Sequence, residues 1–341
     1  MRPSPIFATS LLVLSFAGIA LANDSTASFA TGGLVLTKTA EIAMRSEDLS
    51  VSTEAIRVAY VFRNTSDKPV TTTVAFPVPA IPASPFGNIA IPSDDPENPL
   101  GFETRVDGKP VAMKLDQKAT LNGRDVTELL TGLGVPLAPQ DPKAGEALDA
   151  LPKNKQDELV AAEIAAVDEF DAGGGWERHI VPLWTWSGTY HWEQTFEPGR
   201  DLRVEHSYVP SVGGSVATLL EMAADYPDEV KAMRATYCID DAFMRALDKR
   251  SAQARKADPD YGYAFSEQNF EYVLTTGANW SEPIGDFKLT VDKGAPENLV
   301  SFCADGVTKV SPTRFEVRHQ NFTPKSDLAV LILVPVAAPQ P

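Results

Sequence analysis

Residues 176–208 carry the pattern that decides the fold, and they read WERHIVPLWTWSGTYHWEQTFEPGRDLRVEHSY. Four of the chain's five tryptophans lie in this stretch. Aromatic residues recur at even-numbered positions from Trp184 to Phe196, and a second alternating run extends from Leu202 to Tyr208. A period of two is typical of a strand with one buried face, and the Pro-Gly pair between the runs indicates a turn. The stretch therefore predicts two long strands.

We expect these two strands to form an antiparallel hairpin. For their apolar sets to share one face, Phe196 must lie near Leu202 and Trp192 near His206. One face of the hairpin is then aromatic and the other polar. The aromatic face fits either a buried core or a platform that stacks on carbohydrate, and we favour the core because each large ring buries much apolar area.

Further strands are predicted on both sides of this stretch. Residues 56–62 alternate, residues 64–69 supply a turn and residues 70–76 return, which predicts a second hairpin. Asp107-Gly108 predicts a tight hairpin turn between two further short alternating runs. After Pro259 the chain again consists of short apolar runs with turn residues between them. The pattern predicts a mainly β protein, an antiparallel β-sandwich built as one large or two packed sandwiches.

Two segments rich in helix formers interrupt the strands. Helices are predicted over residues 125–133 and from residue 154 or 155 to residue 170, and another over residues 241–256, where Asp240 or Asp241 caps the N-terminus. We therefore expect two helical insertions. The predicted organisation is a signal peptide over 1–22, an N-terminal β-sandwich region over 23–121, a helical insertion over 122–175, and a C-terminal β-sandwich region over 176–341 with a helical insert at about 215–258.

The N-terminus is typical of an exported protein. Arg2 precedes an apolar run from Ile6 to Leu21, and Ala20-Leu21-Ala22 forms a small-residue cleavage site. We expect cleavage near Ala22 and a periplasmic or secreted mature chain. No later segment approaches the roughly 20 apolar residues that a membrane-spanning helix needs, so no membrane span is predicted in the mature chain.

The chain is acidic, with a formal net charge of −16 at pH 7. Residues 1–22 contain Arg2 as their one charged side chain, so the mature chain carries −17. Such a charge opposes long-range attraction to nucleic acid or anionic lipid. We expect no nucleic-acid partner.

The two cysteines, Cys238 and Cys303, both lie in the mature chain. An even pair in an exported protein is most simply one disulfide. The alternative is two buried free thiols. A catalytic cysteine is disfavoured because neither residue has a CxxC motif or a histidine near it in sequence.

With these strings in view, the chain resembles a family of exported bacterial proteins known as domain of unknown function 4424 (DUF4424). The resemblance rests on motifs spread over nearly the whole mature chain: TGGLVLTK from Thr31, MRSEDLSVS from Met44, FxNxSD over 62–67 with its FPVP end, PSVGG from Pro210, TTGANW from Thr275 followed by PIGDFKL, and DKGAPENLVSFC from Asp292. It implies no established reaction, cofactor or catalytic residue. The hairpin around FxN is also similar to the opening of vault and inter-alpha-trypsin-type β domains, which implies a sandwich-like interaction module.

Other residues fit known chemistry only loosely. The four histidines, His179, His191, His206 and His319, have no metal-ligand spacing. Ser215 follows two glycines as in a nucleophile elbow, but the alternating β/α units of that hydrolase fold are missing. Residues 93–98 gather oxygen ligands without the order of a calcium loop. The adjacent pairs Asp168-Glu169 and Asp240-Asp241 are explained by helix ends.

No catalytic, cofactor or metal residue is therefore assigned, and Trp176 and Trp280, which we expect in exposed loops, are the candidate ligand-contacting residues. We expect an exported, non-catalytic binding or envelope-associated interaction module without a cofactor, with a protein or glycan of the cell envelope as its partner. One alternative is a hydrolase of envelope glycan or peptide that uses carboxylates or Ser215. Another is a structural subunit of a larger assembly.

Overall fold

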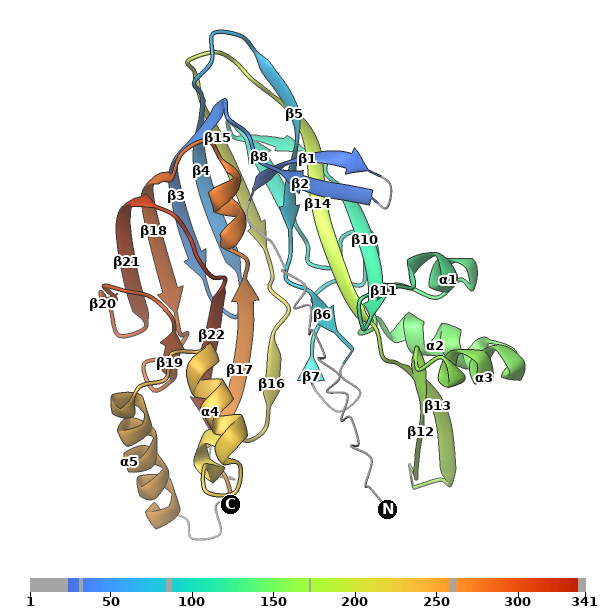
Figure 1. Ribbon diagram of the computed structural model, residues 1–341. Coiled ribbons are helices and arrows are strands. Elements are labelled where there is room, and N and C mark those ends of the chain that lie inside the picture. The colour runs from blue at the N-terminus through green and yellow to red at the C-terminus, as the bar shows by residue number, and fades with distance from the viewer. Residues whose placement is uncertain (1–23, 31–32, 84–87, 172, 258–261, 337–341) are drawn as a thin grey trace, which may run out of the picture.

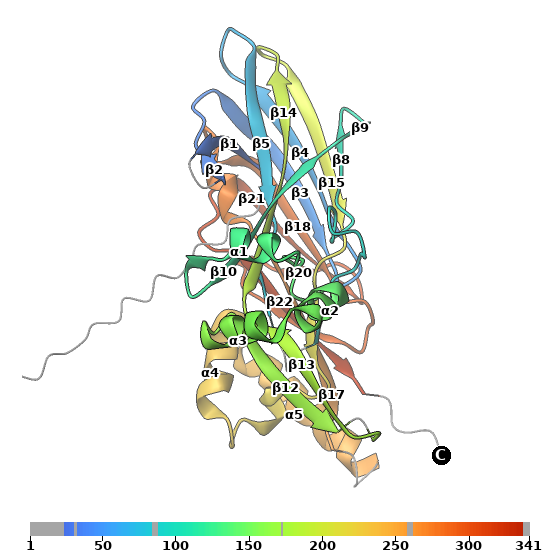
Figure 2. The same ribbon diagram turned by 90° about the vertical axis from the view of Figure 1, so that its right-hand side faces the viewer.

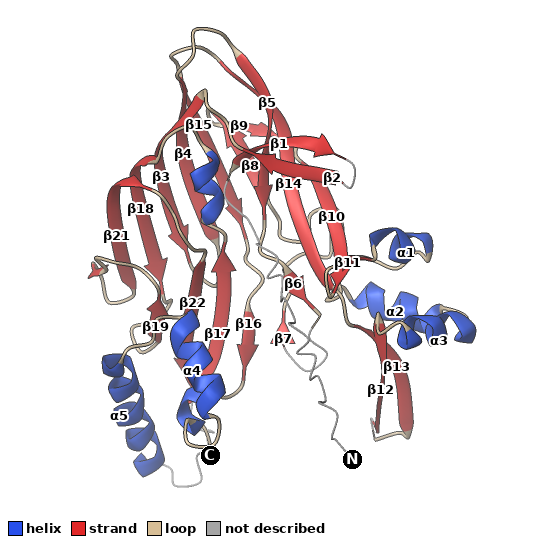
Figure 3. Cartoon of the chain, in the orientation of Figure 1, coloured by secondary structure: helices blue, strands red, loops and turns tan. Residues whose placement is uncertain are grey.

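The computed structural model describes residues 24–30, 33–83, 88–171, 173–257 and 262–336. Its described residues form a mainly β protein in which antiparallel sheets face one another, with helices gathered in two places (Figure 1, Figure 3). This confirms the predicted sandwich-type fold with two helical insertions. One pair of neighbouring strands is parallel, namely β3 (Ile42–Val51) and β18 (Ile284–Asp292).

Sheet A has the strand order β11 (Arg124–Asp125), β10 (Lys114–Leu121), β14 (Thr185–Phe196), β5 (Val70–Pro77), β1 (Ser25–Ala30) and β2 (Gly33–Thr37), and β6 (Ile81–Pro82) also pairs with β14. Sheet B has the order β20 (Thr308–Lys309), β21 (Arg314–Phe322), β18 (Ile284–Asp292), β3 (Ile42–Val51), β4 (Ile56–Asn64), β15 (Asp201–Tyr208), β8 (Glu103–Val106) and β9 (Lys109–Val111).

Two smaller sheets complete the β structure. Sheet C has the order β19 (Leu299–Phe302), β22 (Leu328–Pro335), β17 (Phe265–Tyr272), β16 (Gly213–Ser215) and β7 (Asn88–Ile89). Sheet D is a two-stranded hairpin of β12 (Ala165–Asp171) and β13 (Trp176–Pro182). The helices are α1 (Thr127–Gly132), α2 (Pro142–Ala150), α3 (Lys153–Ala161), α4 (Pro227–Thr236) and α5 (Asp241–Ala257), with 3₁₀ turns η1 (Leu219–Met222) and η2 (Thr275–Asn279).

The main core lies where sheet B faces both sheet A and sheet C. One hydrophobic cluster contains buried residues from all three sheets, such as Trp192 of β14, Tyr60 of β4 and Tyr272 of β17. The hydroxyl groups of Tyr60 and Tyr272 form a hydrogen bond of 2.9 Å between sheets B and C. Alternating side chains from facing sheets meet in this way in sandwich cores.

The aromatic face of β14 is buried, as predicted. Trp186, Tyr190 and Trp192 of β14 are at most 5% exposed, and Trp184, just before β14, is 0% exposed in the cluster beneath the helices. The carbohydrate-platform interpretation is therefore wrong. The predicted hairpin is also wrong. β14 pairs with β10 and β5, whereas β15 pairs with β4 and β8 of the other large sheet.

The chain therefore crosses from sheet A to sheet B at residues 197–200, and it crosses in the opposite direction between β4 and β5. The second predicted hairpin thus also connects two layers. Alternation indicates that a strand has one buried face. It does not indicate whether two such strands are neighbours in one sheet or lie in two sheets that face each other. The predicted neighbours Trp192 and His206 do meet, edge to face at 5.6 Å, but across the core.

Asn64 joins the two crossings. Its side-chain Nδ2 donates hydrogen bonds to the backbone carbonyl oxygens of Lys68 (2.7 Å) and Phe196 (2.8 Å). Its backbone carbonyl oxygen accepts a hydrogen bond from the N–H of Gly199 (2.9 Å). The side chain is fully buried. The asparagine of the FxNxSD motif thus supplies the hydrogen bonds that the two chain reversals need in the interior.

The short hairpin predicted around Asp107-Gly108 is confirmed. β8 pairs with β9 so that Thr104 lies opposite Val111, and both turn residues have positive φ, 47° and 78°. That backbone is the one a two-residue primed turn requires, and Asp-Gly adopts it readily.

Among the helices, α1 and α5 agree with the prediction, and the amide of Phe243 donates to Asp240 at the start of α5 (2.7 Å). The helix predicted to run to residue 170 is wrong. α3 ends at Ala161, Glu163 has a φ of 57°, and the remainder forms strand β12. Pairing of β12 with β13 outweighs the helical propensity of its alanines and glutamate, because propensity is a weak contribution beside tertiary pairing.

The DKGAPENL motif forms a closed turn after β18. Lys293 is buried, and its ammonium donates to the carbonyl oxygens of Pro296 (2.7 Å) and Asn298, while the Asn298 amide donates to the carbonyl of Lys293 (2.7 Å). Asp292 accepts from the N–H of Gly294 (3.0 Å) and from Arg314 Nε (2.9 Å). The motif therefore fixes the path between β18 and β19.

This turn yields a prediction on pH. Partial burial opposes the charge of Asp292, but hydrogen bonds from Arg314, Gly294 and Thr313 prevail and lower its pKa below 3.8. A carboxylate with a lowered pKa contributes stability above its unfolded pKa and loses it as the pH falls through the folded value. Asp292→Asn should lower the free energy of unfolding by about 1 kcal/mol at neutral pH, and the difference from wild type should shrink below pH 4.

Urea unfolding followed by circular dichroism at pH 7 and at steps below pH 4 measures this difference. Asp94→Asn is the matched control, because Asp94 is exposed and no hydrogen bond or ion pair of its side chain occurs within the described residues. A gap between Asp292→Asn and wild type that stays constant with pH would contradict the prediction.

Candidate ligand-binding cleft

A cleft of about 670 Å³ opens between the inner face of sheet B and the start of β22. Its floor is apolar and combines Leu289 of β18, Val317 of β21 and Leu328 of β22 with Phe287 and Leu274. The residues from β18 and β21 occupy alternate positions, so they face the interior together.

Three rings are stacked along one side of this cleft. Phe322 lies 4.4 Å from Phe287 and 5.2 Å from His319 between ring centroids, with interplanar angles of 23° and 15°. His319 and Phe322 are half-buried, so their outer parts remain accessible. Such rings present flat apolar surface with a polar edge at the imidazole.

The mouth of the cleft is polar. Asp305, Lys325 and Asp327 line it, together with Thr323 and Ser326. Asp327 is engaged in the fold, since its Oδ1 accepts from the backbone N–H of Leu274 (3.0 Å) and of Thr275 (3.0 Å). Lys325 and Asp305 form no ion pair within the described part of the chain, so one charge of each sign is available to a ligand.

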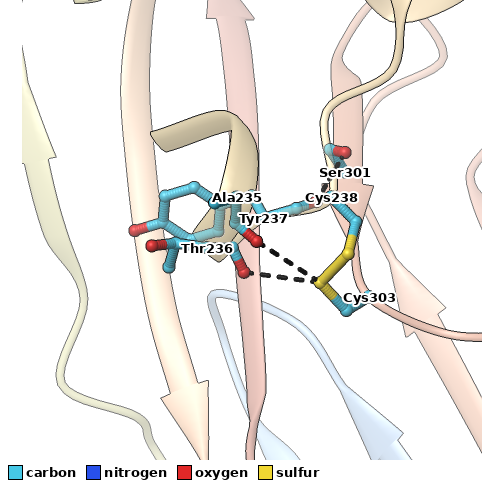
Figure 4. The surroundings of a disulfide bond; sticks show 6 residues. All are labelled: Ala235, Thr236, Tyr237, Cys238, Ser301 and Cys303. Atoms are coloured by element: carbon cyan, nitrogen blue, oxygen red, sulfur yellow. Dashed lines mark hydrogen bonds between the residues drawn. A yellow bond between two sulfur atoms is a disulfide. The ribbon is translucent and has the colours of Figure 1, made fainter. Parts of the chain in front are cut away.

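The opposite wall contains the predicted disulfide, which the structure confirms: Cys238 and Cys303 are bonded at 2.07 Å. Figure 4 shows the bridge beside the end of α4, where a carbonyl oxygen of Thr236 lies 3.5 Å from the Cys303 sulfur. The bridge thus joins the second helical insertion to the segment after β19.

Tyr237 supports this wall. Its carbonyl oxygen accepts a hydrogen bond from Ser301 Oγ (2.8 Å), and burial raises the pKa of its phenol to about 12, with Glu267 and Glu271 adding to the shift. The hydrogen bond fixes the residue before Cys238 against β19.

A second group of interacting polar residues lies inside the core. His206 Nε2 is 3.1 Å from both carboxylate oxygens of Asp24, and Nδ1 is 2.8 Å from Thr104 Oγ1. A carboxylate, an imidazole and a hydroxyl in a row can activate a nucleophile. Here Asp24 is 0% exposed and the other two are 3% exposed, so substrate has no access.

This buried group joins layers of the fold instead. Asp24 precedes β1 of sheet A, whereas His206 and Thr104 belong to β15 and β8 of sheet B. Burial raises the pKa of Asp24, and the neighbouring His206 opposes that shift. Satisfied hydrogen bonds of this kind allow polar groups to be buried without a large energetic cost.

The model of the family called Domain of unknown function (DUF4424) matches residues 22–331, nearly the whole chain. The chain belongs to the DUF4424 family. No curated protein matches this DUF4424 chain at a significant level. Among solved structures, a crystal structure from Legionella pneumophila described as that of a candidate nutrient-binding protein matches with a TM-score of 0.40 and 15% identity, over 91% of this chain and 72% of the other.

In this DUF4424 protein the two candidate tryptophans differ in exposure. Trp176 is 78% exposed, as expected, but it is the first residue of strand β13 and does not lie in a loop. The expectation for Trp280 is wrong, because it is 4% exposed, lies 4.4 Å from Phe62 between ring centroids, and donates its indole N–H to the carbonyl of Asp24 (2.8 Å). The residue after TTGAN is therefore a core residue that holds the start of β1.

The four histidines lie in separate places. His191 and His206 are buried, His319 lines the cleft, and His179 lies on the sheet D hairpin, where hydrogen bonds to Asp149 and Glu177 raise its pKa. No three His, Cys, Asp or Glu side chains among the described residues gather closely enough to hold a metal ion.

The remaining candidates do not form a catalytic group. Ser215 lies opposite Glu267 between β16 and β17, and no described histidine lines the hollow around it. Asp168 and Glu169 are consecutive strand residues, so they point to opposite faces of the hairpin. Residues 93–98 use their oxygens in turns, since Ser93 and Asp95 accept backbone N–H groups.

Sequence reasoning missed the cleft itself. The strands that form its floor were expected, but only as separate short runs, and nothing in one sequence states which strand ends meet. Two features of the sequence could have pointed to the cleft. One is the pair of alternating runs around Phe287 and Val317, and the other is the predicted disulfide, which brings Cys303 close to Cys238.

No helix within the described residues is long and apolar enough to span a membrane. The disulfide fits a protein that folds outside the cytoplasm, because such bonds persist in oxidising compartments.

Proposed function

We propose that the protein is a non-catalytic binding module of the bacterial cell envelope that takes up an amphipathic small molecule in the cleft beside the disulfide. The observation that carries the proposal is the combination of an apolar floor, an accessible aromatic stack and a polar mouth in a hollow of about 670 Å³. Small-molecule sites in proteins are mostly apolar clefts of this size with a few polar groups.

The proposed compartment is the periplasm or the extracellular space. The basic residue, apolar run and small-residue site of residues 1–22 support export with cleavage near Ala22. The disulfide supports the same compartment, because such bonds persist in oxidising environments. It joins two segments that line the cleft. In this arrangement, oxidation completes the wall of the binding site after export.

The chemistry of the cleft defines the ligand class. The floor around Leu289, Val317 and Phe287 favours an apolar body, and the half-buried rings of Phe322 and His319 favour a flat or branched one. The charges of Lys325 and Asp305 at the mouth favour a polar head that stays in contact with water.

Ala304→Trp tests the proposal. Ala304 is exposed and lines the cleft, so a larger side chain can enter it without disturbing the core. The probe is the amphipathic fluorophore anilinonaphthalene sulfonate, titrated into the purified mature protein. We expect saturable binding to the wild type and an affinity at least about tenfold weaker for the variant, which corresponds to about 1.4 kcal/mol.

The matched control is Ala252→Trp, at an exposed position of α5 outside the cleft. It should bind the fluorophore as the wild type does. Native mass spectrometry of the protein isolated from its own envelope then identifies the natural ligand as a mass that the Ala304→Trp variant lacks. Equal fluorophore binding by both tryptophan variants would rule out the cleft as the binding site.

A further inference from the structure

The sheet D hairpin projects away from the sandwich next to α2 and α3 (Figure 1, Figure 2). β12 and β13 pair along their whole length, from Ala165 opposite Pro182 to Asp171 opposite Trp176, and no other described strand pairs with either of them. A two-stranded hairpin is marginal by itself. The stability of this hairpin therefore depends on the contacts that its end nearest the sandwich makes with α2 and α3.

The base of the hairpin is held by α2. Asp149 accepts the backbone N–H of Ile180 (2.7 Å) with one oxygen and lies 2.8 Å from His179 Nδ1 with the other. Ile180 is 1% exposed and belongs to the cluster beneath the helices. Arg178 adds a hydrogen bond to Gln156 of α3 (3.1 Å). The outer half of the hairpin is thus carried on a fixed support.

The hairpin exposes large apolar side chains on both of its faces. Trp176 is 78% exposed and shares its face with Val167, which is 40% exposed and lies nearer the base, opposite Ile180. Phe170 is 44% exposed on the opposite face, where its ring is stacked on His179 at 5.6 Å. The turn behind them is ordered by Asp171, whose Oδ1 accepts the N–H groups of Gly173 (2.9 Å) and Gly175 (3.3 Å). A rigidly presented tryptophan loses little entropy on binding, and tryptophan is enriched at the centres of protein interfaces.

The charge around these rings indicates the kind of partner. The hairpin carries four carboxylates, those of Asp168, Glu169, Asp171 and Glu177. Against them it carries one arginine and one histidine. Glu169 and Asp171 share the face of Trp176, where Glu169 lies 3.8 Å from Arg178, whereas Asp168 and Glu177 lie on the opposite face. A second copy of the hairpin would bring like charges together, which disfavours self-association.

We propose that the tip of the sheet D hairpin is a docking site for a segment of a partner protein that carries lysine or arginine beside apolar residues. The cation stacks on the exposed ring of Trp176 while Glu169 and Asp171 on the same face complete its charge pairing, and the apolar neighbours of the cation cover Val167. This surface is separate from the ligand cleft, and the proposal does not depend on the proposed ligand.

The test measures binding of a dye-labelled synthetic peptide of alternating lysine and leucine to the mature protein by fluorescence anisotropy at physiological salt. We expect Trp176→Ser to weaken binding at least about tenfold, as for the loss of an interface hot spot. Glu169→Gln, on the same face as Trp176, should weaken it less. A peptide of alternating glutamate and leucine should not bind measurably.

Val216→Ser is the matched control, because Val216 is 86% exposed and lies on the segment after β16, far from sheet D in sequence and pairing. It should leave binding unchanged, as should Ala304→Trp in the cleft. If Trp176→Ser and Val216→Ser bind the lysine peptide as the wild type does, the attraction belongs to the acidic surface as a whole and the proposal fails. Equal binding of the glutamate peptide would also overturn it.

A photo-crosslinking residue at position 174, in the turn before Trp176 where an added side chain meets no other atom, extends the test to the native envelope. We expect a crosslinked partner peptide that contains lysine or arginine, with capture reduced at least about tenfold by Trp176→Ser. Crosslinks to segments without a basic residue would contradict the proposed partner chemistry.

Discussion

Replacing Cys238 and Cys303 by serine should lower the free energy of unfolding by about 4 kcal/mol. The bridge spans 65 positions of sequence and encloses α5 together with β17 and β18. Removing it restores the freedom of that long loop in the unfolded chain, while the two sheets that the loop enters remain. The effect is large because the loop is long, and loop-closure entropy grows with loop length.

Urea unfolding of the mature protein, with and without reductant, measures this effect. The wild type should shift to a lower midpoint when reduced, and the double serine variant should show the lower midpoint under both conditions. Because the bridge lines the cleft, reduction should also weaken anilinonaphthalene sulfonate binding. A reduced wild type with an unchanged midpoint would mean that the bridge does not constrain the unfolded chain.

Trp186→Ala should cost about 3 to 5 kcal/mol, the range for removing a large buried aromatic side chain. The indole is 0% exposed, packs in the main cluster, and donates its N–H to Gln117 Oε1 (2.9 Å). Packing around it is close, since a Cβ added at Gly188 would lie 2.6 Å from the ring. The site cannot collapse freely, so the variant is left with a cavity, and Gln117 Oε1 loses the indole donor.

Trp176→Ala provides a control with the same change of residue type. That ring is 78% exposed, so its removal should alter the free energy of unfolding by no more than about 0.5 kcal/mol. Thermal and urea unfolding of both variants provide the comparison. If Trp186→Ala were as mild as Trp176→Ala, β14 would not carry the core, and the assignment of sheets A and B as facing layers would be wrong.

Helix α3, which ends before the predicted residue 170, shows the limit of prediction from local sequence pattern. Residues 154–161 are helical as expected, but the continuation through Ala165 and Val167 fits a helix and a strand about equally well in a short window. What decides the outcome is β13, which follows only after the glycine turn. Glu163, with its positive φ, marks the change, and a single sequence offers no signal for that position.

The candidate tryptophans show the same limit for sites. Trp176 and Trp280 both lie near glycines and charged residues, and both were expected to be exposed. Trp176 follows a turn at the end of a projecting hairpin, whereas Trp280 follows η2, is bonded to Asp24 just before β1, and packs on Phe62. Neighbouring residues do not distinguish the two, because the covering elements are distant in the chain.

The sequence by itself determined the family through its motifs, the mainly β class through its alternation, the burial of the aromatic face, the two helical insertions and the pairing of two cysteines. These properties depend on residue type and local spacing. The tertiary structure alone decided that β14 and β15 lie in facing sheets, that the cleft forms beside the disulfide, and that Asp24 meets His206. A period of two records that a strand has one buried face, and which partner covers that face depends on contacts between residues far apart in the chain.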